Sequence, residues 1–158
     1  MIAYRMWHGP VVGRVVSHAW IGYARVVFLE FGKLSPSDIV RRDGTRGNRR
    51  GEWAIATMRS MSQWSRSIRE RVLTGSDCRY DDTARAIRRL IGRRLLSFEI
   101  DAMSGQTRVR FTHDIVLTTT MLRRHGIPRR PHWDLRAPEG WRDVVLRGTR
   151  LADLPWKK

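Results

Sequence analysis

The sequence has few of the residues from which metal and redox sites are built. Cys78 is its only cysteine, so it can form neither an internal disulfide nor a cysteine-based zinc site. Its five histidines show no zinc-type spacing, and none is paired with a glutamate at helical distance. We therefore expect neither a metal ion nor any other cofactor.

Long apolar runs are also missing. No run approaches the roughly 20 residues that a membrane-spanning helix needs. The first segment, Met1 to Trp20, is interrupted by Arg5, His8 and Arg14, which argues against a signal peptide. The sequence thus predicts a cytoplasmic protein with no membrane partner.

Catalytic motifs are absent as well. Ser17 and Ser97 recur in similar surroundings, but no nucleophile elbow surrounds either of them. Gly44, Gly47 and Gly51 lie in an arginine-rich stretch whose spacing matches neither the dinucleotide fingerprint nor the P-loop. Because nothing assembles a nucleophile, a base and an orienting group, the sequence favours a protein that is not an enzyme.

Acidic residues are scarce beside basic ones. The chain has 15 Asp and Glu against 31 Lys and Arg, a formal net charge of +16. Only three of the basic residues are lysines, and 28 are arginines. A GC-rich genome inflates arginine without functional meaning, whereas a surface that attracts polyanions explains both the arginine and the shortage of acids. Both interpretations stay open at this point.

What the sequence does contain is a self-similarity. Phe31 and Trp53 are separated by 22 positions, and so are Phe111 and Trp133. In both copies the phenylalanine is preceded by Gly-Arg and a serine, at 13–17 and at 92–97. With 158 residues and 41% hydrophobic composition, we expect one domain over 1–158 with an internal repeat at 11–57 and 92–136.

The local patterns predict short strands and one helix. The expected strands are 11–18, 24–31, 53–57, 68–73, 94–101, 106–111, 115–120, 133–136 and 144–146, with another short run around Trp64. The helix is expected at about 82–91, with Asp81, Asp82 and Thr83 as N-cap residues and Gly92 at its C-terminal end. The fold class is therefore α+β, mainly β, with two similar antiparallel β-meander repeats packed together and the helix between them.

Seven tryptophans are many for this length. Trp53 and Trp133 are expected to anchor the core, because aromatic side chains dominate core burial. Trp64 and Trp141 are expected to cap the sheets. The remaining three, Trp7, Trp20 and Trp156, lie near chain ends or turns, where an exposed indole could stack on a base or an arginine.

Several of these segments together resemble a known pattern. They are Phe-Leu-Glu-Phe-Gly at 28–32, Gly-Glu-Trp at 51–53, Trp64, Val-Leu-Thr-Gly-Ser-Asp at 72–77, Leu-Ile-Gly-Arg at 90–93 and His-Trp-Asp-Leu-x-x-Pro-x-Gly at 132–140. Over residues 11–147 the chain resembles a family of small uncharacterised bacterial proteins with a duplicated β-rich unit. The resemblance implies the fold and a bacterial origin, and it implies no activity. The arginine-rich stretch at 41–50 departs from that pattern.

Arginine pairs provide the candidate binding residues. They flank two stretches that precede the equivalent tryptophans, and they are Arg41, Arg42, Arg49, Arg50, Arg123, Arg124, Arg129 and Arg130. Guanidinium groups bind phosphates or carboxylates bidentately, so two symmetric loops would suit a nucleic acid or an acidic protein. The alternative is that long polar loops collect charge because solvent tolerates it.

The sequence therefore favours a non-enzymatic interaction module that binds a polyanion or an acidic partner through these loops. A second hypothesis is a small enzyme whose site is assembled from distant residues such as His113, Asp114 and His132. A third is a bacterial self-protection protein of the immunity type. A concave, buried polar pocket would favour the enzyme, whereas an open basic face would favour the binding module.

Overall fold

The computed structural model describes residues 4–22, 25–36, 40, 42, 44–45, 47, 50–57, 62–68, 71–75, 78–101, 106–121, 133–147 and 150–155. These residues form two six-stranded sheets whose neighbouring strands are all antiparallel. The mainly β architecture with one helix among the described residues confirms the expected fold class. That helix is not long or apolar enough to cross a membrane.

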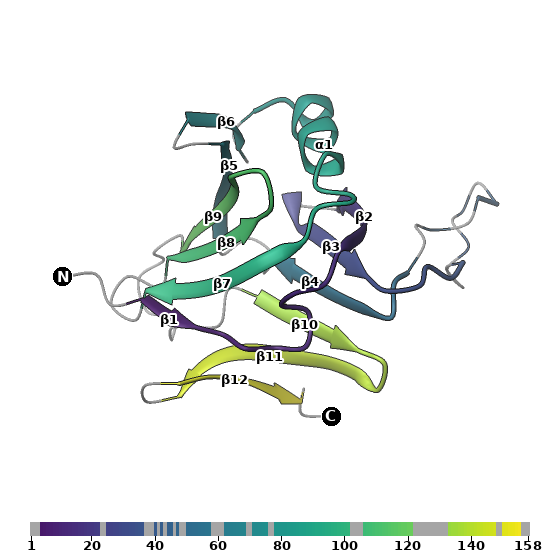
Figure 1. Ribbon diagram of the computed structural model, residues 1–158. Helices are drawn as coiled ribbons and strands as arrows, with labels where there is room; N and C mark the ends of the chain where they lie inside the picture. The colour runs from purple at the N-terminus through teal and green to yellow at the C-terminus, as the bar shows by residue number, and fades with distance from the viewer. Residues whose placement is uncertain are drawn as a thin grey trace.

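The first sheet has the order β1-β7-β8-β9-β5-β6. Its strands are β1 (Tyr4–Met6), β7 (Leu95–Asp101), β8 (Thr107–Phe111), β9 (Ile115–Met121), β5 (Ser62–Ile68) and β6 (Arg71–Gly75). The second sheet has the order β12-β11-β10-β4-β3-β2. Its strands are β12 (Arg150–Pro155), β11 (Gly140–Arg147), β10 (Trp133–Ala137), β4 (Trp53–Thr57), β3 (Val27–Phe31) and β2 (Val16–Ile21). Figure 1 shows the two sheets and the single helix α1 (Tyr80–Arg88), which packs on β2 and β6.

The two sheets share one hydrophobic core. The ring of Phe98 in β7 lies edge-on to that of Trp133 in β10, with 5.3 Å between centroids, so side chains of both sheets meet directly. The buried ring of Trp7 lies edge-on to the same phenylalanine, with 5.0 Å between the ring centroids. Side chains alternate between this core and the outside along β8, where Thr107, Val109 and Phe111 are buried and the arginines between them are not.

A short hydrogen-bonded ladder joins the two sheets where β2 and β7 begin. We call residues 13–16 and 92–95 the central seam. Val15 and Arg94 form an antiparallel bridge there. Four backbone bonds surround it in exchanged pairs: Gly13 N–H to Leu95 O and Gly92 N–H to Val16 O, then Val16 N–H to Arg93 O and Leu95 N–H to Arg14 O, all 2.8–2.9 Å. The two segments therefore bond to each other as the halves of a two-fold symmetric dimer do.

The local geometry around the seam is also shared. Gly13 and Gly92 both have a left-handed backbone, with φ of 85° and 82°, and follow similar short turns. The hairpins β2–β3 and β7–β8 each carry a bulge at the same place, after the pairs Val16↔Phe31 and Leu95↔Phe111. These shared features support the internal repeat, whose common origin stays a prediction.

The predicted equivalence of Trp53 and Trp133 is wrong, because the two tryptophans do not occupy equivalent positions in the strand register. Phe31 pairs with Trp53 in the neighbouring strand, but Phe111 pairs with Ile115. Trp133 lies instead in β10, which adds to the far side of β4 in the other sheet. The equal spacing in sequence arises because the second half inserts β9 before its tryptophan strand, whereas the first half has a long loop there.

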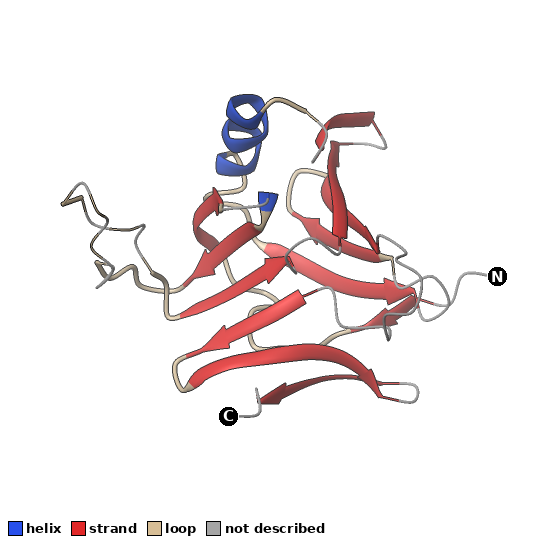
Figure 2. Cartoon of the chain, turned by 180° about the vertical axis from the view of Figure 1, so that it is seen from behind, coloured by secondary structure: helices blue, strands red, loops and turns tan. Residues whose placement is uncertain are grey.

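Each half forms one antiparallel meander, β2-β3-β4 or β7-β8-β9, but the strands that follow it join the other sheet. After β4 the chain continues into β5 and β6 of the first sheet, and after β9 it continues into β10 of the second. Figure 2 shows the strands of the two sheets from behind. The strand order places strands from both parts of the chain in each sheet. Each half thus supplies one meander to one sheet and its next strands to the other.

Several strand and helix boundaries differ from those expected. The turn at 10–13 replaces the start of the first expected strand, and β1 and β12 were not expected. The helix begins at Tyr80, whose hydroxyl donates to the Ile21 carbonyl and thereby fixes that end by a tertiary contact. Arg79 occupies the N-cap position without a side-chain bond, so the expected N-cap of Asp81, Asp82 and Thr83 is wrong. Both aspartates lie in the first turn, where the helix dipole favours negative charge.

The C-terminal end of the helix differs as well. The helix ends at Arg88, and Gly92 is the left-handed residue of the following turn. Leu90 is buried, but Ile91, which lies within the expected helix, is 42% exposed. The helical spacing does not continue through the turn, so it no longer decides which side chains face the core.

Trp133 and Trp53 should differ in their importance for stability. Trp133 is fully buried and contacts Phe98, whereas Trp53 is only partly buried beside the core. Trp133→Ala should lower the free energy of unfolding by about 3–5 kcal/mol, as large aromatic truncations in cores do, and Trp53→Ala by clearly less. Urea denaturation of the two variants measures this difference. Equal losses would show that both indoles anchor the core to the same extent.

A directly opposed pair of core threonines has side-chain hydroxyls without a hydrogen-bond partner among the described residues. Thr107 and Thr119 are register partners across β8 and β9, and both are fully buried. Neither hydroxyl has a hydrogen-bond partner within the described part of the chain. Because a buried unpaired hydroxyl costs about 1–3 kcal/mol, Thr119→Val should raise the free energy of unfolding by about 1 kcal/mol.

Thr57→Val is the matched control for that substitution. The Thr57 hydroxyl is equally buried but accepts the Val27 N–H at 2.9 Å, so its loss should destabilise the protein by about 1–3 kcal/mol. Thermal unfolding compares the two variants. A destabilised Thr119→Val protein would show that its hydroxyl is bonded in solution.

Candidate anion-binding surface

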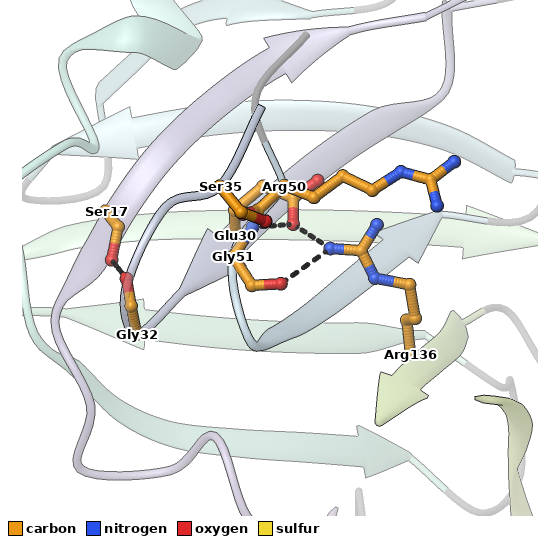
Figure 3. Close-up of polar contacts among 7 residues, drawn as sticks. All are labelled: Ser17, Glu30, Gly32, Ser35, Arg50, Gly51 and Arg136. Carbon is orange, nitrogen blue, oxygen red and sulfur yellow. Dashed lines mark hydrogen bonds and ion pairs between the residues drawn. The ribbon is translucent and has the colours of Figure 1, made fainter. Parts of the chain in front are cut away.

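The loop that follows β3 is held closed at its base. Ser35 and Arg50 form an antiparallel bridge with backbone bonds of 2.7 and 2.9 Å, and the Ser35 hydroxyl also donates to the Arg50 carbonyl at 3.3 Å. The Arg50 side chain is exposed and extends away from this bridge (Figure 3). The fold therefore presents one of the expected binding residues from an ordered base.

A buried ion pair supports that base from below. Glu30 in β3 is 1% exposed, and one of its carboxylate oxygens accepts a bond from the Arg136 guanidinium of β10. The same oxygen accepts the Gly51 N–H at 3.0 Å, while Arg136 donates to the Gly51 carbonyl at 3.0 Å. The pair therefore binds both the N–H and the carbonyl of Gly51 (Figure 3). A charge this deep is tolerated because its bonds are satisfied.

Gly51 has to be a glycine for a steric reason. A Cβ at this position would lie 2.4 Å from the carbonyl oxygen of Phe31, closer than any side chain can approach backbone. Its N–H already binds the Glu30 carboxylate, so it is not available to a phosphate. The glycines of this stretch therefore do not act together as a phosphate cradle, and Gly51 serves the closure of the loop.

Removing one partner of the buried pair should be costly. Arg136→Met leaves the Glu30 carboxylate buried with a single donor in Gly51, and we expect it to lower the free energy of unfolding by about 3–5 kcal/mol. The double variant Glu30→Gln/Arg136→Met, which removes both charges, should lose less than the single one. Urea denaturation of both proteins measures this. A double variant less stable than Arg136→Met would contradict the assignment.

The structure describes two of the eight arginines expected to bind. Arg42 and Arg50 are both exposed. The other six lie outside the described residues: Arg41, Arg49, Arg123, Arg124, Arg129 and Arg130. The symmetric display of the two loops therefore stays a prediction.

Of the three residues in the enzyme hypothesis, the structure describes His113 and Asp114. His113 and Asp114 form the turn between β8 and β9, both with a left-handed backbone at φ of 66° and 57°. His113 lies against Arg93, and His132 is outside the described residues. Among the described residues, no group of three or more His, Cys, Asp or Glu is placed to hold a metal ion. Ser17 donates to the Gly32 carbonyl beside its bulge, which is a structural role.

Other tryptophans and the lone cysteine are placed as follows. Trp7 is buried, so it offers no stacking surface, and Trp20 stacks flat on Phe28 at 4.1 Å. Trp156 and the side chains of Trp64 and Trp141 lie outside the described part. Cys78 is a free, exposed thiol.

Most exposed arginines in the described part of the chain have no acidic partner there. Carboxylates bind Arg85 (Asp82 at 3.7 Å), Arg110 (Glu99 at 3.5 Å) and Arg136 (Glu30). Those without an acidic partner among the described residues are Arg14, Arg42, Arg50, Arg79, Arg88, Arg89, Arg93 and Arg94. All of these are exposed except Arg93, which is half-buried.

The candidate binding residues from the sequence do not include the arginines of the central seam. Arg14 and Arg93 each follow one of the left-handed glycines, and Arg94 forms the bridge with Val15. The recurring Gly-Arg of the two halves was the available signal, and it was interpreted as part of the repeat alone. Their proximity depends on the pairing of segments about 79 positions apart, which no local pattern reveals.

Comparison with known proteins gives no relative. No protein-family model matches the chain, and neither a curated protein nor a solved structure matches it. The resemblance to small bacterial proteins with a duplicated β-rich unit therefore rests on the sequence pattern alone.

Proposed function

We propose that the protein is a non-catalytic module that binds the phosphate backbone of nucleic acids. The observation that supports this most directly is the set of arginines without acidic partners among the described residues. Arginine pairs with phosphate in a planar, bidentate geometry, and its charge does not vary at physiological pH.

A GC-rich genome explains this surface less well than polyanion binding does. A bias toward arginine codons gives no reason for acids to be few, yet the net charge is +16. A surface with this excess repels itself and attracts polyanions over distances comparable to the Debye length, about 8–10 Å at physiological salt. The charge therefore favours a polyanionic partner.

The arrangement of Arg50 supports the same proposal. Its backbone is fixed by the bridge to Ser35, and its neighbour Gly51 is fixed by the buried pair. A basic side chain on an ordered base loses less conformational entropy on binding than one on a free loop. Arg49, beside it in sequence, and the second-half pair Arg129 and Arg130 are proposed to extend this surface.

Binding to duplex DNA at varied salt tests the proposal. The protein should bind with little sequence preference, because phosphate contacts carry no base information. The logarithm of the affinity should fall with the logarithm of salt concentration by about 0.9 per phosphate neutralised. Replacing Arg49, Arg50, Arg129 and Arg130 together by Ala should flatten this slope by about 3–4 if each meets one phosphate. Fluorescence anisotropy with a labelled duplex measures it.

The helix variant Arg85→Ala/Arg88→Ala/Arg89→Ala is the control, because it removes similar charge elsewhere. Equal losses per charge from both variants would point to diffuse attraction and not to a loop-borne site. If the unmodified protein fails to bind at about 50 mM salt, nucleic acid is eliminated as the partner and an acidic protein takes its place.

A further inference from the structure

The chain between β3 and β4 is paired with itself at its base. We call residues 33–50 the arm. Ser35 and Arg50 exchange both backbone N–H···O bonds, at 2.7 and 2.9 Å, as directly opposed residues of an antiparallel ladder do. Val40 takes part in a further β-bridge, so the chain is paired beyond the base as well. The described parts of the arm lie to one side of both sheets in two opposite views (Figures 1 and 2).

Hydrogen bonds fix both chains of this base to the second sheet. The chain that returns into β4 is bound at Gly51, whose N–H and carbonyl contact the buried Glu30–Arg136 pair. The chain that leaves β3 is bound at Gly32, whose carbonyl accepts the Ser17 hydroxyl at 2.6 Å. A ligand that binds the arm therefore meets a support that is already ordered, and less conformational entropy is lost on binding.

The arm is basic and also exposes an apolar side chain. It contains six basic residues and two acidic ones. Arg42 and Arg50 are exposed without an acidic partner among the described residues. Val40 is 65% exposed, more than any other large hydrophobic side chain in the described part of the chain. Gly44 and Gly47 add no bulk, so arginines and one apolar residue are carried on a thin support.

The dimensions of a paired arm select among nucleic acids. Two antiparallel chains lie about 4.8 Å apart, and with their side chains they fit the major groove of B-DNA, about 12 Å wide, but not the minor groove, about 6 Å wide. With residues 36–49 beyond the base pair, about seven residues on each side reach at most about 23 Å, well over the groove depth of about 8.5 Å. The major groove of double-stranded RNA is too narrow for such an arm, and a single strand has no groove.

We infer that the arm enters the major groove of duplex DNA, with Arg42 and Arg50 contacting phosphates along the groove and Val40 facing the base edges. Thymine exposes an apolar methyl group there. The inference rests on the proposed function and names the ligand of the same loop, B-form DNA in preference to RNA or a single strand. An acidic protein offers carboxylates but no groove of this width.

An armless variant tests the inference. Residues 36–49 are replaced by Asn-Gly, because two residues that exchange both backbone bonds can be joined by a two-residue turn of this kind. In fluorescence anisotropy, the unmodified protein should bind a labelled DNA duplex at least about tenfold more tightly than an RNA duplex of the same sequence. The armless variant should bind the two duplexes equally.

Arg88→Ala/Arg89→Ala is the matched control. The armless variant loses four arginines and two aspartates and so two positive charges net, as this helix variant does. The helix variant should weaken binding to both duplexes alike and keep the preference for DNA. Thermal unfolding of both variants establishes that they are folded.

A point substitution keeps the inference testable if the armless variant does not fold. Val40→Asp places a carboxylate against the phosphates of the groove, so the affinity for the DNA duplex should fall by at least about tenfold. Leu96→Asp adds the same charge at another exposed apolar residue outside the arm, which is 52% exposed, and should weaken binding clearly less. Equal losses from the two substitutions would overturn the site.

A DNA duplex with uracil in place of thymine tests the position of Val40. This duplex lacks only the methyl groups in the major groove. The unmodified protein should bind it about fourfold more weakly if one methyl group is covered, whereas the armless variant should bind both duplexes equally. An unchanged affinity of the unmodified protein would overturn the contact between Val40 and the base edges.

The remaining outcomes separate this inference from the proposed function. Equal affinity of the unmodified protein for DNA and RNA duplexes would overturn the role of the arm and leave phosphate binding intact, and so would an unchanged DNA preference in the armless variant. Tighter binding of polyglutamate than of the DNA duplex would assign the arm to an acidic protein instead. Absence of any binding by the unmodified protein at about 50 mM salt would overturn both proposals.

Discussion

The backbone ladder at the central seam is the contact on which the other parts of this fold depend. It pairs segments about 79 positions apart and joins the sheets where β2 and β7 begin. The two left-handed glycines, Gly13 and Gly92, stand at its ends, where their conformation suits no other residue as well. The hairpins that follow build the two sheets outward from this ladder, and their bulged registers keep Phe31 and Phe111 in the shared core.

A second long-range contact, between Glu30 and Arg136, connects the same two parts of the chain through β3 and β10. Its carboxylate and guanidinium bind the backbone of Gly51 and so close the loop that begins after Gly32. The Arg50 side chain is thereby presented from an ordered loop base. Its charge is exposed, while the Glu30–Arg136 pair that binds the neighbouring Gly51 is shielded from solvent.

The sequence alone predicts well where the strands lie, but it predicts poorly which strands pair with one another. Short apolar and β-branched runs identify β4, β7, β8 and β9 almost to the residue. The same runs do not say which sheet a strand joins, and so Trp133 was matched with Trp53 when register places Ile115 there. The helix start was misplaced because Tyr80 is fixed by a tertiary bond to Ile21 that outweighs the capping signal of the aspartates. The backbone pairing at the central seam could not be predicted, since it joins segments about 79 positions apart.

The exchange of strands between the halves sets an order of events during synthesis. The free edge of β4 receives its neighbour β10 only after some 75 further residues have been added. At about 5–20 residues per second, that edge waits roughly 4–15 seconds on the ribosome with unpaired backbone groups. An open strand edge is a template for pairing with other chains, so the nascent first half is the form in which this protein is most vulnerable to aggregation. In this topology β10 covers the β4 edge only after most of the chain has been made.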